Sequence, residues 1–358
     1  MACPHNAETV GHIAARPTVA SENPRNWRRS TPRWHAGERL WTSGRGPAFH
    51  AGLSNGNPSA KALMRRDVNP LLQNLLQTRL QQIAGRFGAV SPQLGAAMEH
   101  AAMSPGKRFR GMLLLLAADA SGGVSDALVD AAAAIEMVHA ASLIFDDMPC
   151  MDDAALRRGQ PATHVAHGES RALLAGIALI TEAMSVLAAA RGASAQVRAS
   201  LIGILAEALG PQGLCAGQDL DLHSDKDRPG VELEQDLKTG VLFVAGLEML
   251  AVIEGYDEEE RAQVVAFGRQ LGRVFQSYDD LLDVIGTPES VGKTTGRDRQ
   301  APGPERGLLA VGDMHHVSRH YEASRAQLDA MLNHRRLRAP EIAALLERVL
   351  PYAVRDSA

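Results

Sequence analysis

The sequence predicts an all-α fold, a single large bundle of about ten helices. Apolar residues make up 45 % of the 358 residues, enough for a substantial core, whereas aromatic residues make up only 4 %. Ala, Leu and Gly are abundant, and this mixture suits closely packed helices better than a β-sandwich, whose strands favour β-branched and aromatic residues. From about residue 67 onwards apolar residues recur at helical intervals, and no segment alternates convincingly as a strand would.

The helices are expected in the following order. The first begins where Val68, Leu71, Leu72, Leu75 and Leu76 recur at three- and four-residue intervals. Later helical windows cover roughly residues 107–121, 125–148, 168–191, 195–209, 213–223, 231–254, 258–286, 313–333 and 339–350. Glycine and proline separate several of these windows, at Ser121–Gly123, Gly210–Pro211, Pro229–Gly230, Glu254–Gly255 and Ala301–Pro304.

Residues 1–62 differ from the rest of the chain. They are rich in Pro, Gly, Ser, Asn and Arg and show no sustained apolar period. Such a segment cannot bury enough apolar surface to offset its ordering entropy, so we expect a disordered N-terminal extension before a domain at 63–358. A partner-binding or targeting segment, or sequence upstream of a later natural start such as Met64, are the alternatives.

Composition excludes several classes of function. The formal net charge of −4 gives no reason to expect nucleic acid as a partner. Cys3, Cys150 and Cys215 are odd in number and form no CxxC pair, so we expect no disulfide framework, no cysteine zinc site and a cytoplasmic location. No apolar run approaches the roughly 20 residues that span a bilayer, so no membrane span is expected.

The first candidate site is an aspartate-rich segment that closes an apolar helical window. It reads DDMPCMDD, residues 146–153, and follows the apolar residues 135–145. Because Pro149 disfavours helix at the residue before it, the chain is expected to bend there. The bend should bring Asp152 back beside Asp146.

A second aspartate-rich segment, FQSYDDLLD at residues 275–283, lies inside the helical window 258–286. Gln276, Asp279 and Asp283 are separated by three and four residues, so they share one helical face. Either segment alone is best explained as a solvated acidic face. Because both follow strongly apolar runs, we expect them to face inward, where a cation would offset their repulsion. Oxygen ligands without His or Cys favour Mg²⁺ or Mn²⁺, and two facing clusters would clamp a polyphosphate.

Basic residues recur beside the acidic ones. Lys107, Arg108 and Arg110 open the apolar segment Met112–Ala118. A helix N-terminus disfavours cations but attracts phosphate through its free N–H groups, so a solvated loop and a diphosphate site both remain open. Similar polar residues lie elsewhere: Arg157, Arg158, Lys238, Thr239, Lys293, Gln218, Asp221 and, two turns before Asp146, His139.

Together these motifs resemble those of the trans-prenyltransferase family, the (E)-polyprenyl diphosphate synthases, and are most similar to bacterial geranylgeranyl diphosphate synthases. The resemblance runs from about residue 68 to the C-terminus and rests on GKRFR, DDMPCMD followed by LRRGQPATH, GQDLDL, KTG, FQSYDDLLD and a later GK, in this order. Pro105 and Gly111 are small departures from the family pattern. The resemblance implies a helical bundle of the isoprenoid synthase type around a central cavity, and a homodimer.

The resemblance also implies a role for each matching residue. Isopentenyl diphosphate would be bound through its diphosphate by Lys107, Arg110, His139 and Arg158. The allylic diphosphate would be held by Arg157, Lys238, Thr239, Gln276 and Lys293. About three Mg²⁺ ions would be bound, with Mn²⁺ as an alternative, by Asp146, Asp147, Asp152, Asp279 and Asp283. Gln218 and Asp221 would support these ligands. The catalytic set would be Asp146, Asp147, Asp152, Lys238, Asp279, Asp280 and Lys293.

The implied reaction is the head-to-tail (1′-4) condensation of isopentenyl diphosphate with an allylic diphosphate. Ala141, followed by Ser142, stands five positions before the first aspartate motif, where similar farnesyl synthases commonly carry an aromatic residue. The small side chain and the two extra residues in DDxxxxD favour geranylgeranyl diphosphate, a carotenoid precursor among other uses. Farnesyl diphosphate is the runner-up.

Three other classes compete with this interpretation. A class I terpene cyclase would also clamp metal, but it normally has a different second motif and lacks the Lys107, Arg110 and Arg158 set. A catalytically silent regulatory subunit tends to lose its aspartate motifs, and both are intact here. A structural bundle with acidic faces gives no reason for basic residues to recur beside the acidic ones.

Overall fold

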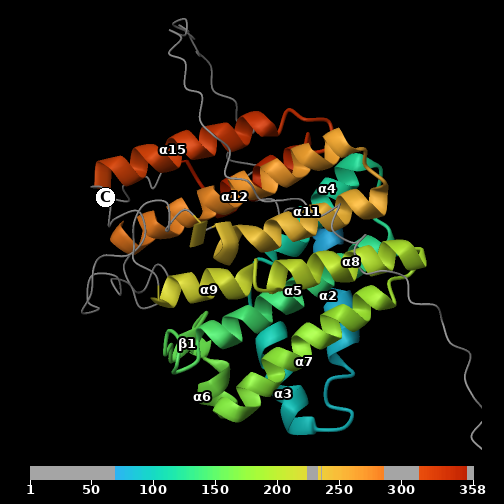
Figure 1. Ribbon diagram of the computed structural model, residues 1–358, viewed down its shortest axis with the longest axis vertical. Coiled ribbons are helices and arrows are strands. Elements are labelled where there is room, and N and C mark those ends of the chain that lie inside the picture. The colour runs from blue at the N-terminus through green and yellow to red at the C-terminus, as the bar shows by residue number, and fades with distance from the viewer. Residues whose placement is uncertain (1–68, 224–232, 235, 286–313, 353–358) are drawn as a thin grey trace, which may run out of the picture. The chain divides into compact units, whose positions relative to one another are not determined.

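The structure is a computed structural model that describes residues 69–223, 233–234, 236–285 and 314–352. Most of these residues are helical (Figure 1). The first half contains α2 Pro70–Ala84, α3 Pro92–Ala102, α4 Phe109–Ser121, α5 Asp126–Asp146, α6 Thr163–His167 and α7 Glu169–Ala188. The second half contains α8 Ala195–Leu209, α9 Leu214–His223, a π-helix at Asp236–Gly240, α11 Val241–Glu254, α12 Glu258–Ile285, α15 Met314–Met331 and α16 Pro340–Val349. A hairpin of two short antiparallel strands, β1 Leu156–Arg157 and β2 Gln160–Pro161, follows α5.

The core is built around α5. This helix packs against α7, α4, α11, α2 and α3, and most of its 21 residues are buried. Ala131–Ala134 are fully buried, and these small side chains let the neighbouring helices approach closely. On α4 the run Met112–Ala118 is buried as well, so its leucines fill the space beside α5.

Local sequence signals account for several helix boundaries. The side chains of Asn69, Ser91 and Ser194 each accept a hydrogen bond from the backbone N–H three residues later, at the start of α2, α3 and α8. Gly255 ends α11 with φ 66°, a left-handed conformation that glycine adopts without strain. These caps satisfy backbone groups that a helix end would otherwise leave unpaired.

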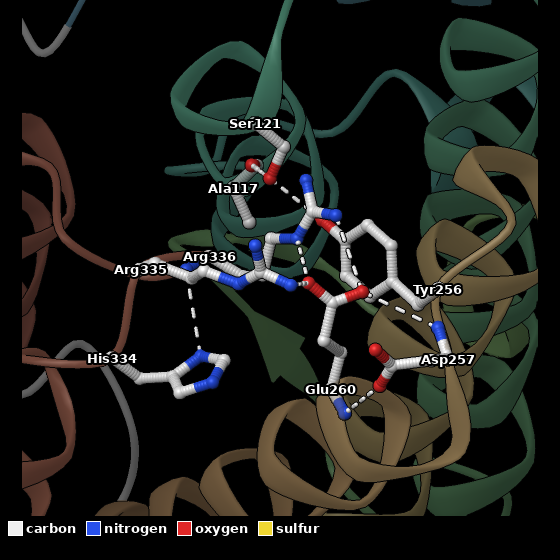
Figure 2. Close-up of polar contacts among 8 residues, drawn as sticks. All are labelled: Ala117, Ser121, Tyr256, Asp257, Glu260, His334, Arg335 and Arg336. Carbon is white, nitrogen blue, oxygen red and sulfur yellow. Dashed lines mark hydrogen bonds and ion pairs between the residues drawn. The ribbon is translucent and has the colours of Figure 1, made fainter.

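A network of charged residues centred on Glu260 joins three parts of the chain (Figure 2). Glu260 is buried at the start of α12, and both of its carboxylate oxygens accept from Arg336, at 2.8 and 3.2 Å. Arg335 forms a second ion pair with Glu260. Asp257 and Glu260 also accept each other's backbone N–H, at 2.8 and 3.3 Å, which is a capping box for α12. The segment between α15 and α16 is thereby attached to the N-terminus of α12.

The same network reaches α4 through Tyr256. The guanidinium of Arg336 lies 4.2 Å from the centre of the Tyr256 ring, and the Tyr256 hydroxyl is 2.6 Å from Oγ of Ser121. Ser121 in turn donates to the carbonyl of Ala117 at 2.8 Å. The residues labelled in Figure 2 therefore form a connected set of contacts between α4, α12 and the loop before α16.

Three helical segments are long and apolar enough to cross a membrane when length and composition alone are considered. They are Asp126–Asp146, Glu169–Ala188 and Ala195–His223. The most apolar part of the first is 83 % buried inside the protein, as expected of the central helix. The expectation that the chain has no membrane span stays a prediction.

The all-α fold is confirmed, and most helices lie within a few residues of their predicted windows. Two helices, α3 and α6, and the hairpin were not predicted. Residues 1–62 and the loop that carries Lys293 lie outside the described residues, so the expected N-terminal extension and domain boundary stay predictions.

Candidate active site

The first aspartate segment forms a tight bend at the end of α5. The backbone N–H of Asp152 donates to the carbonyl of Asp146 at 2.9 Å, and that of Ala154 donates to Asp147 at 3.2 Å. Pro149 lies inside the bend, as its effect on the preceding residue predicted. The expected return of Asp152 to the side of Asp146 is confirmed at the level of the backbone.

Asp147 is turned into the protein and paired with Arg157 of β1. Its carboxylate is almost fully buried and accepts from Nε of Arg157 at 3.0 and 3.1 Å, with a further short contact to Nη2. Burial works to lower the pKa of Arg157, but the hydrogen bonds and charge of Asp147 outweigh it and leave the pKa raised. In this structure Asp147 therefore fixes Arg157, and its predicted role as a metal ligand stays a prediction.

The hairpin turn directs the next arginine to a different place. Arg158 and Gly159 have φ of 53° and 76°, and two successive positive values are typical of a type I′ hairpin turn. Nη1 of Arg158 donates to the carbonyl of Pro105 at 3.3 Å. A Cβ atom on Gly106 would lie 2.5 Å from that same Nη1. Gly106 therefore leaves the space in which Arg158 reaches the loop before α4.

Arg110 and His139 meet between α4 and α5. Nη1 of Arg110 lies 3.3 Å from Nε2 of His139, and its guanidinium lies 4.5 Å from the centre of the Phe243 ring. Burial lowers the pKa of Arg110 to about 10, partly offset by Glu136 and Asp279. Burial, followed by four nearby arginines, lowers the pKa of His139 well below its ordinary value. His139 is therefore neutral, and its Nε2 accepts a hydrogen bond from Nη1 of Arg110.

Glu136 connects the entry of α4 to α5. Its Oε1 accepts the backbone N–H of Gly111 at 2.8 Å, and its Oε2 lies 4.0 Å from Nη1 of Arg108. Arg108 is the N-cap of α4 and has φ 48° with no side-chain cap, so the first N–H groups of α4 lie beside a group of cations. Lys107 belongs to this group, and burial and Arg348 lower its pKa.

The π-helix carries Lys238 and Thr239 and contacts both aspartate segments. Nζ of Lys238 lies 2.5 Å from the carboxylate of Asp221 on α9, and Asp146 and Asp152 help to raise its pKa against the effect of burial. Oγ1 of Thr239 donates to the Gln276 side chain of α12 at 3.0 Å. The segment thus faces the first aspartate cluster through one residue and the second through the next.

Asp146 is the most perturbed carboxylate of this region. Burial raises its pKa to about 6, the charge of Lys238 opposes that effect, and Asp152 adds to it. Burial disfavours the ionised form of this carboxyl group in the protein alone. A further cation beside it would favour the ionised form. The position therefore has the electrostatic character of a metal ligand.

A pocket lies along one face of α5. Its polar lining includes Arg108, Glu136, His139, Arg157 and Arg158, and its apolar lining includes Ala140, Leu143 and Ile144. Cations at one part of the wall and aliphatic groups at another suit an anion that carries a hydrocarbon. Ala141 is fully buried and does not line this pocket, and Ser142 donates to the carbonyl of His139 at 2.9 Å.

The chain matches the polyprenyl synthetase family over residues 91–349. It belongs to this family. A geranylgeranyl diphosphate synthase from Pantoea ananas is 44 % identical over 241 residues, which cover 66 % of this chain and 78 % of that protein. One from Pseudescherichia vulneris is 39 % identical over 243 residues, covering 66 % and 74 %.

Solved structures of prenyltransferases agree with the fold. An FPP/GFPP synthase from Zymomonas mobilis superimposes with a TM-score of 0.66 at 30 % identity, covering 79 % of this chain and 97 % of that one. A geranyltransferase from Helicobacter pylori, complexed with magnesium and isoprenyl diphosphate, gives 0.69 at 28 % identity, covering 82 % and 98 %. This polyprenyl synthetase is therefore a prenyltransferase of the all-α isoprenoid synthase type.

Proteins of the polyprenyl synthetase family use divalent metal to bind diphosphate, and the described residues of this one are compatible with that use. The described part of the chain contains no group of three His, Cys, Asp or Glu side chains already placed around one point. Asp146, Asp152 and Asp279 offer only carboxylate oxygens, which suit Mg²⁺ when substrate and water complete its shell. Oε1 of Gln218 is buried beside this region with no hydrogen-bond partner among the described residues, so it is available to accept from a metal-bound water.

Several predicted residues lie outside the description. The side chains of Asp280 and Asp283, and all of Lys293, are not among the described residues. Glu136 was not predicted, although it lies three residues before His139 on the same helical face. An acidic residue inside the apolar window 125–148 was the available signal.

Proposed function

We propose that this prenyltransferase condenses isopentenyl diphosphate head-to-tail with an allylic diphosphate, with Mg²⁺, and that geranylgeranyl diphosphate is its product. The observation that carries the proposal is the presence of two adjoining cationic groups beside one acidic centre, which meet at the pocket lined by both Arg157 and Arg158. One group is Arg110, Arg158 and Lys107 around the entry of α4. The other is Arg157 and Lys238 beside Asp146. Two groups accommodate two diphosphates.

The first group would bind isopentenyl diphosphate. Nε of Arg110 is buried and has no hydrogen-bond partner among the described residues, which is costly unless a ligand supplies an acceptor. Neutral His139 can donate from its other ring nitrogen, and Arg158 approaches from the hairpin. Burial lowers the pKa of both Arg110 and Arg158, which shows that their charged forms are costly to bury. An arriving diphosphate anion would offset that cost.

The second group would hold the allylic diphosphate with Thr239, Gln276 and Lys293. Asp146, Asp147, Asp152, Asp279 and Asp283 would hold Mg²⁺, with Gln218, Asp221 and Asp280 in support, and the metal would supply neutralisation of the leaving diphosphate. Lys238 and Arg157 lie where they add positive charge as the allylic C1–O bond breaks and its electron pair departs with the diphosphate. The C3=C4 electrons of isopentenyl diphosphate then form the bond to C1. Loss of a proton from C2, to the departed diphosphate, restores the double bond.

The small residue Ala141 supports a C20 product. It is fully buried on α5, one turn before Phe145, whose ring lies so close to α7 that a Cβ on Gly176 would meet it at 2.5 Å. The relatives from Pantoea ananas and Pseudescherichia vulneris carry the same product in their names. Farnesyl diphosphate remains the alternative.

We also propose a cytoplasmic homodimer. Three large apolar side chains, Leu173, Leu174 and Ile177, are exposed on α7, where a second copy would cover them. Cys150 and Cys215 are free thiols, which suits a reducing compartment. Analytical ultracentrifugation of the wild-type chain and of Leu174→Glu tests the dimer, because a charge in the interface should produce monomer. A monomeric wild type would contradict this part.

Incubation with labelled isopentenyl diphosphate, Mg²⁺ and each of dimethylallyl, geranyl and farnesyl diphosphate tests the activity and its chain length. The expected product is C20 from all three primers. A C15 product would select the alternative, a cyclised hydrocarbon would indicate a terpene cyclase, and no product from any primer would overturn the proposal.

Replacement of Ala141 by Tyr tests the chain-length role. The product should shift from C20 towards C15, because a ring would narrow the space beside α5. Overpacking can destabilise a core, so Ala141→Ser, which adds one atom, is the matched control and should keep the C20 product. An unchanged product from folded Ala141→Tyr would exclude a role for this residue.

A further inference from the structure

The π-helix Asp236–Gly240 is held between two helices that each approach it at a glycine. A π-turn contains an extra residue, is rare, and is frequently found at functional sites. It carries Lys238 and Thr239, which face the two aspartate segments.

On one side, Gly217 of α9 lies directly against the backbone of the π-helix. A Cβ atom at this position would lie 2.5 Å from N of Lys238, 2.7 Å from C of Leu237 and 2.9 Å from Cα of Lys238. All three are backbone atoms, so no side-chain rotation can make room. Any residue larger than glycine would push α9 and the π-helix apart.

On the other side, Gly272 of α12 makes the same kind of approach. A Cβ atom there would lie 2.4 Å from Cα and 3.1 Å from N of Gly240. Here both partners are glycines, so the two backbones are in contact. The π-helix is therefore enclosed by glycine contacts from both helices.

A polar contact accompanies each glycine one turn further along its helix. Asp221, four residues after Gly217, lies 2.5 Å from Nζ of Lys238. Gln276, four residues after Gly272, accepts from Thr239 at 3.0 Å. Residues four apart share a helical face, so each helix presents a glycine and a polar side chain to the same segment. The glycine sets the separation, and the polar group sets the direction of the side chain.

We propose that Gly217 and Gly272 are positioning residues that hold the π-helix so that Lys238 and Thr239 reach the allylic diphosphate. The identity of that ligand rests on the proposed function. The contacts of Gly217 and Gly272 with the π-helix, here called the glycine clamp, are backbone contacts. Their effect on the π-helix can be measured without enzymatic turnover.

The test compares Gly217→Ala and Gly272→Ala with two matched controls. Gly203 of α8 has nothing within 4 Å of its Cβ position, and Gly246 of α11 would meet side chains only at 3.7 Å and beyond. Amide hydrogen exchange at Leu237–Gly240 should accelerate in both clamp variants and stay unchanged in Gly203→Ala and Gly246→Ala. Equal protection in all four variants would overturn the proposal.

Binding gives the second readout. The Kd for the thiolo analogue of geranyl diphosphate with Mg²⁺ should rise by about tenfold or more in the clamp variants, because a lost hydrogen bond to a charged group corresponds to roughly that change in affinity. The KM for isopentenyl diphosphate should change far less. An equal loss for both substrates would indicate a general structural role and contradict the proposal.

Double-mutant cycles separate positioning from simple destabilisation. Gly217→Ala should raise the Kd for the allylic analogue only slightly further in a Lys238→Ala background, because the group being positioned is already gone. Gly272→Ala should likewise raise it only slightly further in a Thr239→Val background. Full additivity in both cycles would overturn the proposal. If an alanine variant does not fold, Asp221→Asn and Gln276→Leu replace it in the exchange measurement, with the same expected acceleration. A wild type that does not condense the substrates would overturn the proposed function but leave the exchange result interpretable.

Discussion

Two clusters of charge in this protein are built from similar residues and behave differently. Around Glu260, a buried carboxylate meets Arg335 and Arg336, and Tyr256 and Asp257 complete the contacts (Figure 2). Around Asp146, carboxylates from one bend face Lys238 and Arg157. The carboxylate at the centre of the first cluster is paired by arginines of the same cluster. The second cluster keeps acids close together, and Oε1 of Gln218 beside it is buried with no hydrogen-bond partner among the described residues. A cluster whose buried charges are paired within the protein indicates a structural connection. A cluster that leaves buried polar groups without such pairing indicates a place for a ligand.

The pKa values of the two central acids, Glu260 and Asp146, are shifted in opposite directions. Hydrogen bonds from Arg336 hold the pKa of Glu260 below its ordinary value, so the folded protein favours its charged form. Burial raises the pKa of Asp146 to about 6, so the folded protein disfavours its charged form. The four predictions below test this contrast, from the largest expected effect to the smallest.

Asp146→Asn should lower kcat/KM by about 100-fold to 1000-fold, because the amide cannot supply the negative ligand at the reacting diphosphate. Steady-state assays with isopentenyl and allylic diphosphates measure the effect. Asp219→Asn is the control, since its side chain is 76 % exposed on α9 and should leave activity unchanged. Activity within tenfold of wild type in Asp146→Asn would contradict a ligand role.

The metal-free protein should lose stability as pH rises from about 4 to 6 through Asp146. Its folded pKa exceeds its unfolded pKa, so the folded state binds more protons in this window and the free energy of unfolding falls with pH. The loss is at most about 3 kcal/mol, from a shift of about two pKa units. Urea unfolding in EDTA at pH 4.5 and 7.5 should show the difference between wild type and Asp146→Asn. An identical pH dependence in the two proteins would exclude the shift.

Glu260→Gln should lower Tm at pH 7 while kcat/KM stays within about twofold, because the cluster is separate from the site. A depressed pKa stabilises the fold above the unfolded pKa, and this contribution is lost as pH falls through the folded pKa. The loss of Tm relative to wild type should therefore shrink towards low pH. Asp146→Asn should differ in sign, with a gain in stability over wild type at pH 7 that also shrinks towards low pH. Glu259→Gln, an exposed neighbour, is the control. A large loss of kcat would contradict the separation of the clusters.

Tyr256→Phe should have the smallest effect, about 1 kcal/mol in the free energy of unfolding. It removes the 2.6 Å contact with Ser121, but Ser121 keeps its bond to Ala117 and the ring still faces Arg336. Urea unfolding at pH 7 measures it. A loss as large as that of Glu260→Gln would mean that the hydroxyl, not the carboxylate, organises the cluster.

Helix positions were predictable where the punctuation was strong. The window 195–209 coincides with α8, and 258–286 ends one residue beyond α12, because Gly or Pro residues lie next to these segments. The helix α3 was missed because its apolar face consists mostly of alanine and glycine, although Ser91 and Pro92 were a usable start signal. The hairpin was missed because two-residue strands are too short to show an alternating period.

Pairings were less predictable than positions. The return of Asp152 to Asp146 followed from Pro149, a local effect. The pairing of Asp147 with Arg157 depends on a turn with two positive φ values, which a basic Arg158 does not signal. The contact of Glu260 with Arg336 joins residues 76 apart. The Asp257–Glu260 capping box is a local pattern in the sequence, but it was not predicted.

The alanine-rich composition of α5 has a consequence for ligand binding. Alanine has no rotamer freedom to lose, so a helix lined with it costs little side-chain entropy to order. Asp146 therefore stands at the end of a tightly packed central helix whose side chains cost little entropy to hold in place.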